Sequence, residues 1–548
     1  MDTRRTTRCG AVALVTAALL LSGCTGGASS SPAKPGSGAS ARDSRAGAKA
    51  PVLKPLSAKI PDALKPYYAQ KLRWRPCDAA GTDAPTAPEA PDPDLPPFEC
   101  AKLRVPLDYT HPRGSEDLRL AVVRKRASGP KRDRIGSLQV NPGGPGGSAV
   151  DYVERVAALS YPREVRERYD IVGMDPRGVA RSEPVACLTD RQMDRYTETD
   201  QTPDDTAEVR RLGAAFQRFA DGCRQRTGNR LGHVSTVEAA RDMDVLRAAL
   251  GDRKLHYVGA SYGTYLGAFY AGLFPSRSGR LVLDGAMDPS LSARRVNREQ
   301  TAGFETAFRA FARDCVKRDD CPLGTEDVRQ AARNLNALFR KLDRTPAETG
   351  DPSRELTESQ ATTGVVRAMY DEGSWPTLRE ALTEVKKGRG APLLALSDDY
   401  YERDGSGGYS NIMYANTAVN CLDLPPAFRT PAEARASLPS FEKASPVFGR
   451  SFAWAALNCG YWPQKATGAP HRITAEGAPP ILVTGTTRDP ATPYRWARGL
   501  AGQLTSARLL TYDGDGHTAY LRGSTCIDSA INAYLLDNRP PKDGTTCS

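Results

Sequence analysis

Short apolar runs recur from residue 118 onward and predict the strands of one sheet. Residues 118–124 alternate apolar and polar side chains, which is typical of a strand with one face in water. The other runs are almost continuously apolar, as in strands buried on both faces, and they cover residues 136–140, 169–175, 254–258, 280–285, 480–485 and 507–512. Helical spacing over residues 237–250 precedes one of these runs. Strand, helix and strand in this order predict an α/β fold, a mostly parallel sheet with helices on both faces.

Between about residues 288 and 418 the strand pattern fades and helical spacing takes its place, as in residues 304–311. We therefore expect a mainly helical cap over residues 289–418, inserted above the end of the sheet that carries the motifs described below. The sheet domain is then divided into an N-terminal part, residues 61–288, and a C-terminal part, residues 419–548.

The first residues predict export. Arg4, Arg5 and Arg8 precede an apolar run over residues 11–21, and Leu-Ser-Gly-Cys follows, ending at Cys24. A basic start, a short apolar run and a small-residue cleavage site are typical of a secretory signal, here residues 1–23. The ending resembles a bacterial lipobox, so cleavage would leave Cys24 as a lipid-modified first residue. The alternative is a plain secretory signal with an incidental cysteine.

Residues 24–60 are mostly small, polar or prolyl residues, which cannot bury enough apolar surface to fold, and we expect a flexible tether. No later run is long and apolar enough to span a bilayer, so a lipid on Cys24 is the expected membrane contact. The protein is then lipid-anchored at the cell membrane or extracellular.

Cysteine usage agrees with export. Cys9 and Cys24 lie in the signal region, and the other ten form an even set that predicts disulfides in an oxidising compartment: Cys77, Cys100, Cys187, Cys223, Cys315, Cys321, Cys421, Cys459, Cys526 and Cys547. Pairing of nearest neighbours is the simplest connectivity, but the sequence does not fix it. Since none shows C-x-x-C spacing near histidines, no metal is expected. The net charge of +11 is spread without basic runs among aromatics, so no nucleic-acid partner is expected.

The candidate nucleophile is Ser261, in Gly-Ala-Ser-Tyr-Gly over residues 259–263. The motif lies between the predicted strand at 254–258 and a helical run. A serine on such a turn is held in a strained conformation that exposes its hydroxyl at the edge of a sheet. The alternative is an ordinary tight turn, because the motif is common by chance.

Residues 141–148 contain four glycines and two prolines directly after a predicted strand. In α/β-hydrolases a loop in this position donates a backbone amide to the oxyanion hole. Gly143 and Gly144 are therefore the candidate donors, together with the amide of Tyr262 after the serine. A flexible surface loop is the alternative.

A serine nucleophile needs a histidine base that is oriented by a carboxylate. Only His471 and His517 follow Ser261, and His517 lies just past the last predicted strand, where such sheets place their sites. His111, His233 and His256 precede the serine. Asp489 follows the penultimate strand directly, and it is favoured over Asp513 and Asp515, which are too close to His517 along the chain.

With these motifs the chain resembles the bacterial tripeptidyl aminopeptidases, in the proline-iminopeptidase-like branch of the α/β-hydrolases. The resemblance starts at about Leu72 and rests on residues 141–146, 175–178, 259–263, 489–493 and 514–517. It implies an exopeptidase that acts on peptides with a free N-terminus and releases short peptides, without a cofactor. The loop before the oxyanion glycines has Pro142 where many relatives have histidine.

The triad does not distinguish ester from amide hydrolysis, so a carboxylesterase or a proline iminopeptidase of the same fold remains an alternative. A surface lipoprotein without catalysis is a third, although the intact set of Ser261, Asp489 and His517 argues against it. An aminopeptidase must also bind the substrate ammonium, and Asp288, Glu305 and Asp423 near the cap are weak candidates for that contact.

Overall fold

The computed structural model describes residues 50–77, 97–114 and 116–548. The predicted signal segment, Cys24 and most of the predicted tether lie outside these residues, so they stay predictions. In the part of the chain that is described, no helix combines the length and the apolar character needed to cross a membrane.

A ten-stranded sheet forms the centre of the described structure, in the order β1-β2-β3-β5-β4-β6-β7-β8-β9-β10. Pairing is antiparallel from β1 to β5 along this order and parallel from β5 to β10. The strands are β1 (Arg75–Pro76), β2 (Phe98–Pro106), β3 (Asp117–Lys125), β4 (Gly136–Asn141), β5 (Tyr169–Met174), β6 (Leu255–Ala260), β7 (Ser278–Asp284), β8 (Ile481–Arg488), β9 (Ala507–Asp515) and β10 (Thr545–Cys547).

The predicted strands are confirmed, because each of the seven apolar runs lies in one of β3 to β9. The sequence interpretation missed β1, β2 and β10. Strand β2 has the same alternating pattern as β3, with Leu103 and Val105 buried and Arg104 exposed between them. The mostly parallel α/β sheet is confirmed.

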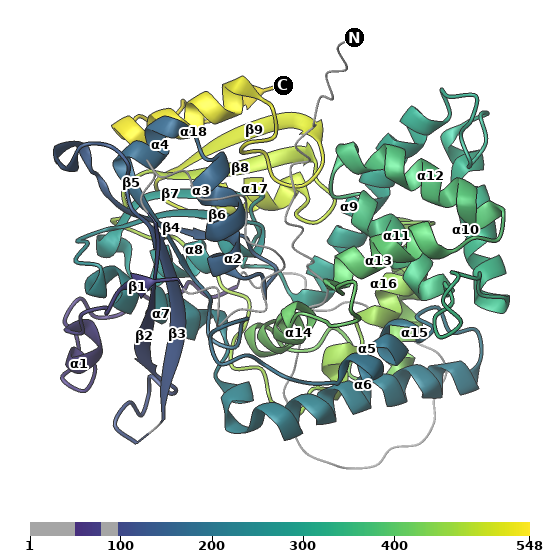
Figure 1. Cartoon of the computed structure of the whole chain (residues 1–548), viewed down its shortest axis with the longest axis horizontal. Helices are drawn as coiled ribbons and strands as arrows, with labels where there is room; N and C mark the ends of the chain where they lie inside the picture. Colours follow the sequence, from purple (N-terminus) through teal and green to yellow (C-terminus); the bar gives the residue numbers. More distant parts are fainter. Residues whose placement is uncertain (1–49, 78–96, 115) are drawn as a thin grey trace, which may run out of the picture.

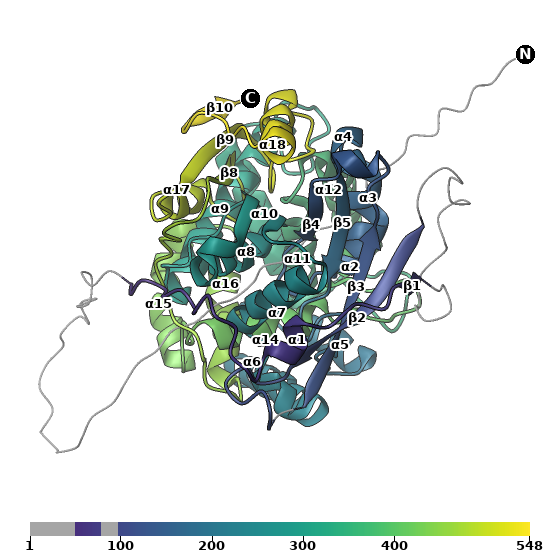
Figure 2. The ribbon, with the colours of Figure 1, turned by 90° about the vertical axis from the view of Figure 1, so that its left-hand side faces the viewer.

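Helices cover both faces of the sheet, and alternate strand residues face two separate hydrophobic cores (Figure 2). In β7, Leu281 and Leu283 pack toward one core and Val282 toward the other. The first core holds α1 (Lys65–Tyr68), α7 (Thr236–Ala249), α8 (Tyr262–Leu273) and α17 (Tyr494–Ala501). The second holds α2 (Ala149–Tyr152), the π-helix η3 (Val153–Ala157), α3 (Ala158–Ser160), α4 (Arg163–Arg168) and α18 (Thr525–Asp537).

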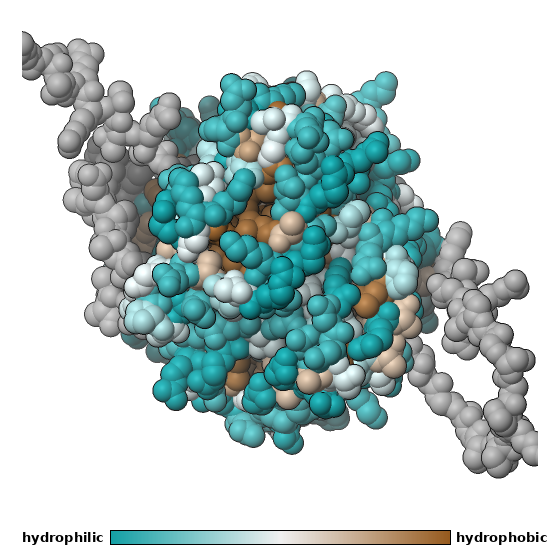
Figure 3. All heavy atoms as spheres, turned by 90° about the vertical axis from the view of Figure 1, so that its right-hand side faces the viewer, coloured by the Kyte–Doolittle hydropathy of each residue, from teal (hydrophilic) through white to brown (hydrophobic). Residues whose placement is uncertain are grey.

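A helical lid lies beside the sheet domain, at the right of Figure 1. Most of it is inserted between β7 and β8, as α9 (Ala293–Cys315), α10 (Val328–Arg344), α11 (Glu358–Ala368), α12 (Trp375–Lys386), α13 (Ala391–Tyr401), α14 (Ile412–Asp423), α15 (Pro431–Ala444) and α16 (Gly449–Ala455). Its outer face is mostly hydrophilic, with apolar side chains gathered in a hollow (Figure 3). Short 3-10 turns complete the chain: η2 (Lys131–Asp133), η4 (Gly228–Gly232), η5 (Pro275–Arg277), η6 (Glu372–Ser374) and η7 (Asn458–Tyr461).

The lid extends beyond the cap that the sequence predicts. The expected end at residue 418 falls inside α14, and helices continue to α16 before β8 begins at Ile481. Two earlier helices, α5 (Asp190–Thr197) and α6 (Thr206–Thr227), also join the lid, since Phe219 of α6 packs against Tyr414 of α14 at 5.8 Å between ring centroids. The boundary at 418 is therefore wrong, because helical spacing does not say which layer a helix packs against.

Five disulfides join neighbouring cysteines along the chain: Cys77–Cys100, Cys187–Cys223, Cys315–Cys321, Cys421–Cys459 and Cys526–Cys547. This is the simplest connectivity that the sequence left open. Three of the bridges hold lid segments together, at α6, α9 and α14.

Candidate active site

Ser261 lies on a sharp turn between β6 and α8. Its backbone has φ +57° and ψ −122°, a conformation that non-glycine residues rarely adopt. The turn is held by hydrogen bonds on both sides, from the Ser261 amide to the carbonyl of Asp284 at 2.8 Å and from the Thr264 amide to the carbonyl of Ser261 at 2.9 Å. Strain of this kind persists only where the surrounding structure fixes it, and it fits the predicted nucleophile elbow.

The two glycines of the motif are required by close backbone contacts. A Cβ atom on Gly259 would lie 2.4 Å from the carbonyl oxygen of Gly263, and one on Gly263 would lie 2.7 Å from that of Asn141 in β4. Real Cβ atoms do not approach so closely, so larger residues would push α8 away from the sheet.

Asp489 and His517 lie after β8 and β9 and contact each other directly. Nδ1 of His517 is 2.9 Å from each carboxylate oxygen of Asp489. Asp489 also accepts hydrogen bonds from the amides of Ala491, Thr492 and Thr518 at 2.8–3.1 Å. The carboxylate is 2% exposed, so these donors replace water around it and fix its position against the imidazole.

Ser261 and His517 both lie next to the end of β7. Ser261 bonds to Asp284, as above, and a Cβ atom on the next residue, Gly285, would lie 3.4 Å from Cε1 of His517. Oγ of Ser261 and Nε2 of His517 are buried, and neither has a hydrogen-bond partner among the described residues. The bond between a nucleophile and its base is commonly long without substrate and tightens in the complex, so this arrangement can activate the hydroxyl.

The glycine loop after β4 lies against the residue that follows the serine. A Cβ atom on Gly143 would lie 3.0 Å from the amide nitrogen of Tyr262. The amide of Gly143 itself donates to Oδ1 of Asn141 at 2.9 Å, whereas the amides of Gly144 and Tyr262 have no acceptor among the described residues. Of the two candidate glycines, Gly144 therefore offers the free amide donor. Gly143, which has no side chain, lets the loop lie close to Tyr262.

Asp284 positions the loop that carries the histidine. Its buried carboxylate accepts the amide hydrogens of Ala519 and Tyr520, at 3.1 and 3.0 Å. Burial raises the pKa of Asp284, while the nearby His517 opposes that rise. The sequence interpretation missed this residue, although it ends a predicted strand.

Three relatives of known type match nearly the whole chain. The serine protease Hip1 of Mycobacterium tuberculosis is 38% identical over 498 residues, which are 88% of this chain and 92% of that protein. Carboxylesterase B of the same organism is 37% identical over 90% of this chain and 93% of its own length. The tripeptidyl aminopeptidase of Streptomyces lividans is 33% identical over 84% of this chain and 85% of its own. A family model described as TAP-like protein matches residues 445–547.

The chain belongs to the tripeptidyl aminopeptidase family of α/β-hydrolases. The resemblance drawn from the sequence motifs and the expected α/β-hydrolase fold are thereby confirmed, and the protein is a serine hydrolase. These relatives carry both protease and esterase names, so membership alone does not choose the bond that is cleaved.

In this family member the lid contacts the site at two points that the sequence did not reveal. The carbonyl of Tyr370, just after α11, accepts the amide hydrogen of His517 at 2.9 Å, and the two rings pack edge to face at 5.5 Å. Nδ2 of Asn416 in α14 donates to the carbonyl of Pro145 in the glycine loop at 3.1 Å. Asn416 and Asn420 lie four residues apart in a mostly apolar helix, which is a signal for a polar contact that the sequence did carry.

Other histidines and acids that were weighed against His517 and Asp489 lie in structural positions. His256 lies within β6, where burial lowers its pKa to about 4. His471 bonds to the carbonyl of Ala469 at 2.6 Å. Asp513 and Asp515 both bind Arg488, at 2.8 and 2.9 Å.

Arg177 in the family motif at residues 175–178 has a structural role. Its guanidinium is buried and binds the carboxylate of Asp242 in α7 at 2.7 and 2.8 Å. It also donates to the carbonyls of Pro106, Leu107 and His233. Arg177 thus joins α7 to the end of β2.

Asp175, two residues before Arg177, anchors the glycine loop to the end of β5. It accepts hydrogen bonds from Oγ of Ser148 at 2.7 Å and from the amide of Val150 at 3.0 Å. Burial raises its pKa to about 6.

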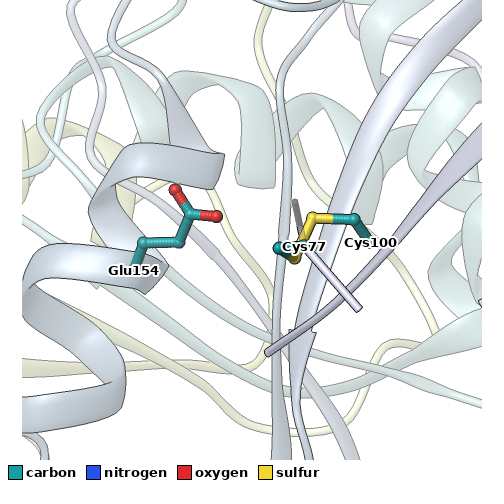
Figure 4. Close-up of side chains that lie close together, drawn as sticks. All are labelled: Cys77, Cys100 and Glu154. Carbon is teal, nitrogen blue, oxygen red and sulfur yellow. A yellow bond between two sulfur atoms is a disulfide. The ribbon is translucent and has the colours of Figure 1, made fainter. Parts of the chain in front are cut away.

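Two groups of potential metal ligands occur among the described residues, and neither resembles a preformed metal site. Glu154 lies beside Cys77 and Cys100, but these sulfurs are bonded to each other and are not thiolates (Figure 4). Asp108, His233 and Glu238 form the second group, where Nη1 of Arg177 lies 3.5 Å from the Glu238 carboxylate and supplies a positive charge already.

The three acids weighed for binding a substrate ammonium already have partners. Asp288 binds Ser290 and Gln503, and Glu305 binds Arg309 and Ser445. Asp423 accepts from the amide and the hydroxyl of Thr236, and burial raises its pKa to about 7.

Proposed function

We propose that this protein is a serine exopeptidase that releases short peptides, with tripeptides as the expected product, from free N-termini. The observation that carries the proposal is the arrangement of three buried groups past β6, β8 and β9. Asp489 holds Nδ1 of His517, while Nε2 of His517 and Oγ of Ser261 are buried near the end of β7, and neither atom has a hydrogen-bond partner in the described structure. A roof of helices above this site favours chain ends over the interior of folded proteins.

The chemistry would proceed through an acyl-enzyme. Nε2 of His517 takes the hydroxyl proton as Oγ of Ser261 bonds to the scissile carbonyl carbon, and the carbonyl oxygen becomes an oxyanion. The amides of Tyr262 and Gly144 stabilise that oxyanion, and loss of one such donor raises the barrier by about 3–4 kcal/mol. The peptide C–N bond then breaks as the imidazolium protonates the departing amine. Water, deprotonated by His517, hydrolyses the ester and restores Ser261.

A carboxylesterase is the second candidate, supported by the 37% identity to carboxylesterase B. The exopeptidase and the carboxylesterase are distinguished by comparing two kinds of substrate. These are p-nitroanilides of one, two and three residues, and short p-nitrophenyl esters. We expect the tripeptide amide to be cleaved fastest, and Ser261→Ala to abolish that cleavage. Ser406→Ala, in an exposed loop, is the control and keeps full activity.

Cleavage of esters without amides by the wild-type protein would refute the peptidase. Peptide cleavage that persists at the wild-type rate in Ser261→Ala would refute the serine mechanism.

We infer from the sequence that the protein is exported and anchored through a lipid on Cys24. The support is the basic and apolar start, the Leu-Ser-Gly-Cys ending and the even cysteine set. Mass spectrometry of the mature N-terminus should find residue 24 as the first, carrying acyl groups, and Cys24→Ala should release the protein from the membrane. An unmodified N-terminus would contradict the anchor.

A further inference from the structure

The end of the lid helix α14 brings a buried carboxyl group into the sheet domain. Asp423, the last residue of α14, is 6% exposed and lies against the first turn of α7 (Figure 1). Its carboxylate accepts the backbone amide of Thr236 at 2.8 Å and also the hydroxyl of that residue. A residue of the lid therefore binds the start of the helix that leads to the nucleophile strand β6.

The chain of hydrogen bonds continues from Thr236 to the residue after the candidate nucleophile. Oγ1 of Thr236 lies 2.5 Å from the hydroxyl oxygen of Tyr262. Because the hydroxyl of Thr236 donates to Asp423, the hydroxyl of Tyr262 is the donor in this contact. Burial, and then the charge of Asp423, raise the pKa of Tyr262, so the phenol keeps the proton that it donates.

The carboxyl group of Asp423 has no countercharge. Burial raises its pKa to about 7, the two hydrogen bonds from Thr236 oppose the rise, and the negative charge of Glu238 in α7 adds to it. No positive charge contributes to this shift, and burial followed by the charge of Asp423 raises the pKa of Tyr265 as well. A buried acid without a cation is costly, and here Thr236 and the positive end of the α7 dipole compensate for it.

Tyr262 is the residue at which these hydrogen bonds reach the reaction. Its backbone amide has no acceptor among the described residues and is one of the two candidate oxyanion donors. The ring of Tyr262 stacks on that of Tyr265 at 6.2 Å, and its hydroxyl is fixed by Thr236. A Cβ atom on Gly143 would lie 3.0 Å from the Tyr262 amide nitrogen, so a shift of this residue would also disturb the glycine loop.

Helix α14 holds the other side of the candidate oxyanion hole too. Nδ2 of Asn416 donates to the carbonyl of Pro145, the residue after Gly144. Asn416 and Asp423 lie seven residues apart, which is about two turns, so they share one face of α14. One face of a lid helix thus contacts both segments that carry an oxyanion donor.

Contacts other than the Cys421–Cys459 disulfide hold the end of α14 in place. The carbonyl of Leu422 accepts the amides of Thr467 and Gly468, each at 2.9 Å. A Cβ atom on Gly468 would lie 2.2 Å from the carbonyl oxygen of Asp423, so the two segments are in close contact. These contacts fix the position of Asp423 without requiring the disulfide.

We propose that Asp423 is a positioning residue for the oxyanion hole: through the hydroxyl of Thr236 it holds the side chain of Tyr262, and so keeps the Tyr262 amide aimed at the carbonyl oxygen of the substrate. The proposal rests on the serine mechanism above, and it gives the lid a part in the chemical step besides covering the site. Because esters and peptides both form an oxyanion, the effect extends to both kinds of substrate.

The test removes one hydrogen-bonding group at a time. Thr236→Val and Tyr262→Phe each delete a hydroxyl, and Asp423→Asn replaces one carboxylate oxygen by an NH₂ group. We expect each variant to lower kcat at least tenfold for Ala-Ala-Ala-p-nitroanilide and for p-nitrophenyl acetate, with KM for the anilide within twofold of wild type. Thr236→Ser keeps the hydroxyl and should retain at least half of the wild-type kcat.

Two further measurements distinguish positioning from a general loss of structure. Inhibition by Ala-Ala-Ala-aldehyde, which adds the hydroxyl of Ser261 across its carbonyl, should weaken by the same factor as kcat falls. Thr236→Val combined with Tyr262→Phe should lose no more activity than Thr236→Val alone, because both changes break the same chain of bonds. Thr227→Val is the control: this buried threonine bonds only to the backbone of Ala186, and kcat should be unchanged.

A wild-type kcat in Thr236→Val or Tyr262→Phe would overturn the proposal. A rise in KM for the tripeptide amide at unchanged kcat in Asp423→Asn would overturn it as well, since that pattern indicates direct contact between Asp423 and the substrate. A wild-type protein that cleaves only esters would refute the peptidase function alone, and kcat for p-nitrophenyl acetate would still decide the role of Asp423.

Discussion

At the scale of single residues, backbone geometry at the glycine loop matters as much as the triad. Gly143 has φ +98°, and a Cβ there would lie 2.5 Å from the carbonyl of Ala260 and 3.0 Å from Cβ of Ser261. Gly477 also has a positive φ, of +83°, but nothing lies within 4 Å of the Cβ position. Both positions would be strained by a side chain, but only at Gly143 would that side chain also collide with Ser261. Comparing substitutions at the two glycines therefore distinguishes backbone strain from a steric effect on the candidate nucleophile.

We predict that Gly143→Ala lowers kcat for the tripeptide amide by at least 100-fold, because the displaced loop moves the Gly144 amide away from the oxyanion. Gly477→Ala should cost about 1 kcal/mol of unfolding free energy for its left-handed backbone and leave kcat unchanged. Steady-state kinetics and urea unfolding of both variants make the comparison. Equal loss of activity in the two would contradict a specific role for the loop.

Glu358, a buried residue at the start of α11, should affect stability in a pH-dependent way. Burial raises its pKa to about 8, above the value of about 4.3 for an unfolded chain. The folded state then binds more protons than the unfolded state between these values, so its stability falls as the pH rises through that range. Glu358→Gln resembles the protonated side chain, so it removes the free-energy cost of ionising a buried carboxyl group.

We predict that Glu358→Gln and the wild type unfold with equal free energies near pH 4, and that the variant is more stable by a few kcal/mol at pH 8. Urea unfolding at pH 4, 6 and 8 measures the difference. In Glu355→Gln, which removes an exposed charge three residues away, the difference from wild type should not grow with pH. A wild type that gains stability relative to Glu358→Gln as the pH rises would contradict the raised pKa.

At the scale of elements, a buried ion pair joins α7 to the strands beside it. Arg177 has no exposed side-chain surface and shares its hydrogen bonds between Asp242 and three backbone carbonyls. Removing one partner leaves a buried charge unpaired, which costs about 3–5 kcal/mol, whereas replacing both by apolar groups costs less.

We predict that Arg177→Met lowers the free energy of unfolding by about 3–5 kcal/mol, and that Arg177→Met combined with Asp242→Leu recovers part of that loss. Chemical denaturation of the single and double variants tests the coupling. Arg181→Met, whose ion pairs with Asp151 and Glu154 are partly exposed, is the control and should cost less than about 1 kcal/mol. Strictly additive losses would show that the pair is not coupled.

Elements differ in how well the sequence foretold them. Strands β3 to β9 were predicted because parallel strands buried on both faces have nearly continuous apolar runs. The lid helices were harder to place, since amphipathic spacing marks a helix but not the layer it covers. Phe219 of α6 packs against Tyr414 of α14, far along the chain, and no local pattern reports that contact.

At the scale of the whole molecule, the disulfides divide between the lid and the two edges of the sheet. Cys421–Cys459 ties α14, which contacts the glycine loop, to the turn at η7. Cys526–Cys547 ties α18 to β10 at the last edge of the sheet. The two disulfides close loops of 38 and 21 residues. Because each restricts the unfolded chain to a similar extent, removing either one should lower the free energy of unfolding by about 3–4 kcal/mol.

We predict that the double variant Cys421→Ser/Cys459→Ser raises KM for the tripeptide amide at least fivefold and leaves hydrolysis of p-nitrophenyl acetate near wild type, because α14 lines a cavity among the lid helices and carries no residue of the triad. Cys526→Ser/Cys547→Ser should lose comparable stability without this change in KM. Kinetics on both substrates, below the unfolding temperature of each variant, provide the measurement. Equal KM values in the two variants would contradict a lid-specific effect.

The sequence by itself determined the central sheet and the candidate triad, because both depend on local signals: apolar runs, glycines that only a tight turn requires, and the order of Ser261, Asp489 and His517 along the chain. Tertiary structure alone decided which glycine amide is free, how far the lid extends, and that Asn416 of the lid binds the glycine loop. These facts arise from contacts between residues far apart in the chain. The candidate nucleophile was therefore readable from five residues, whereas the contacts of the lid join separate segments that only folding brings together.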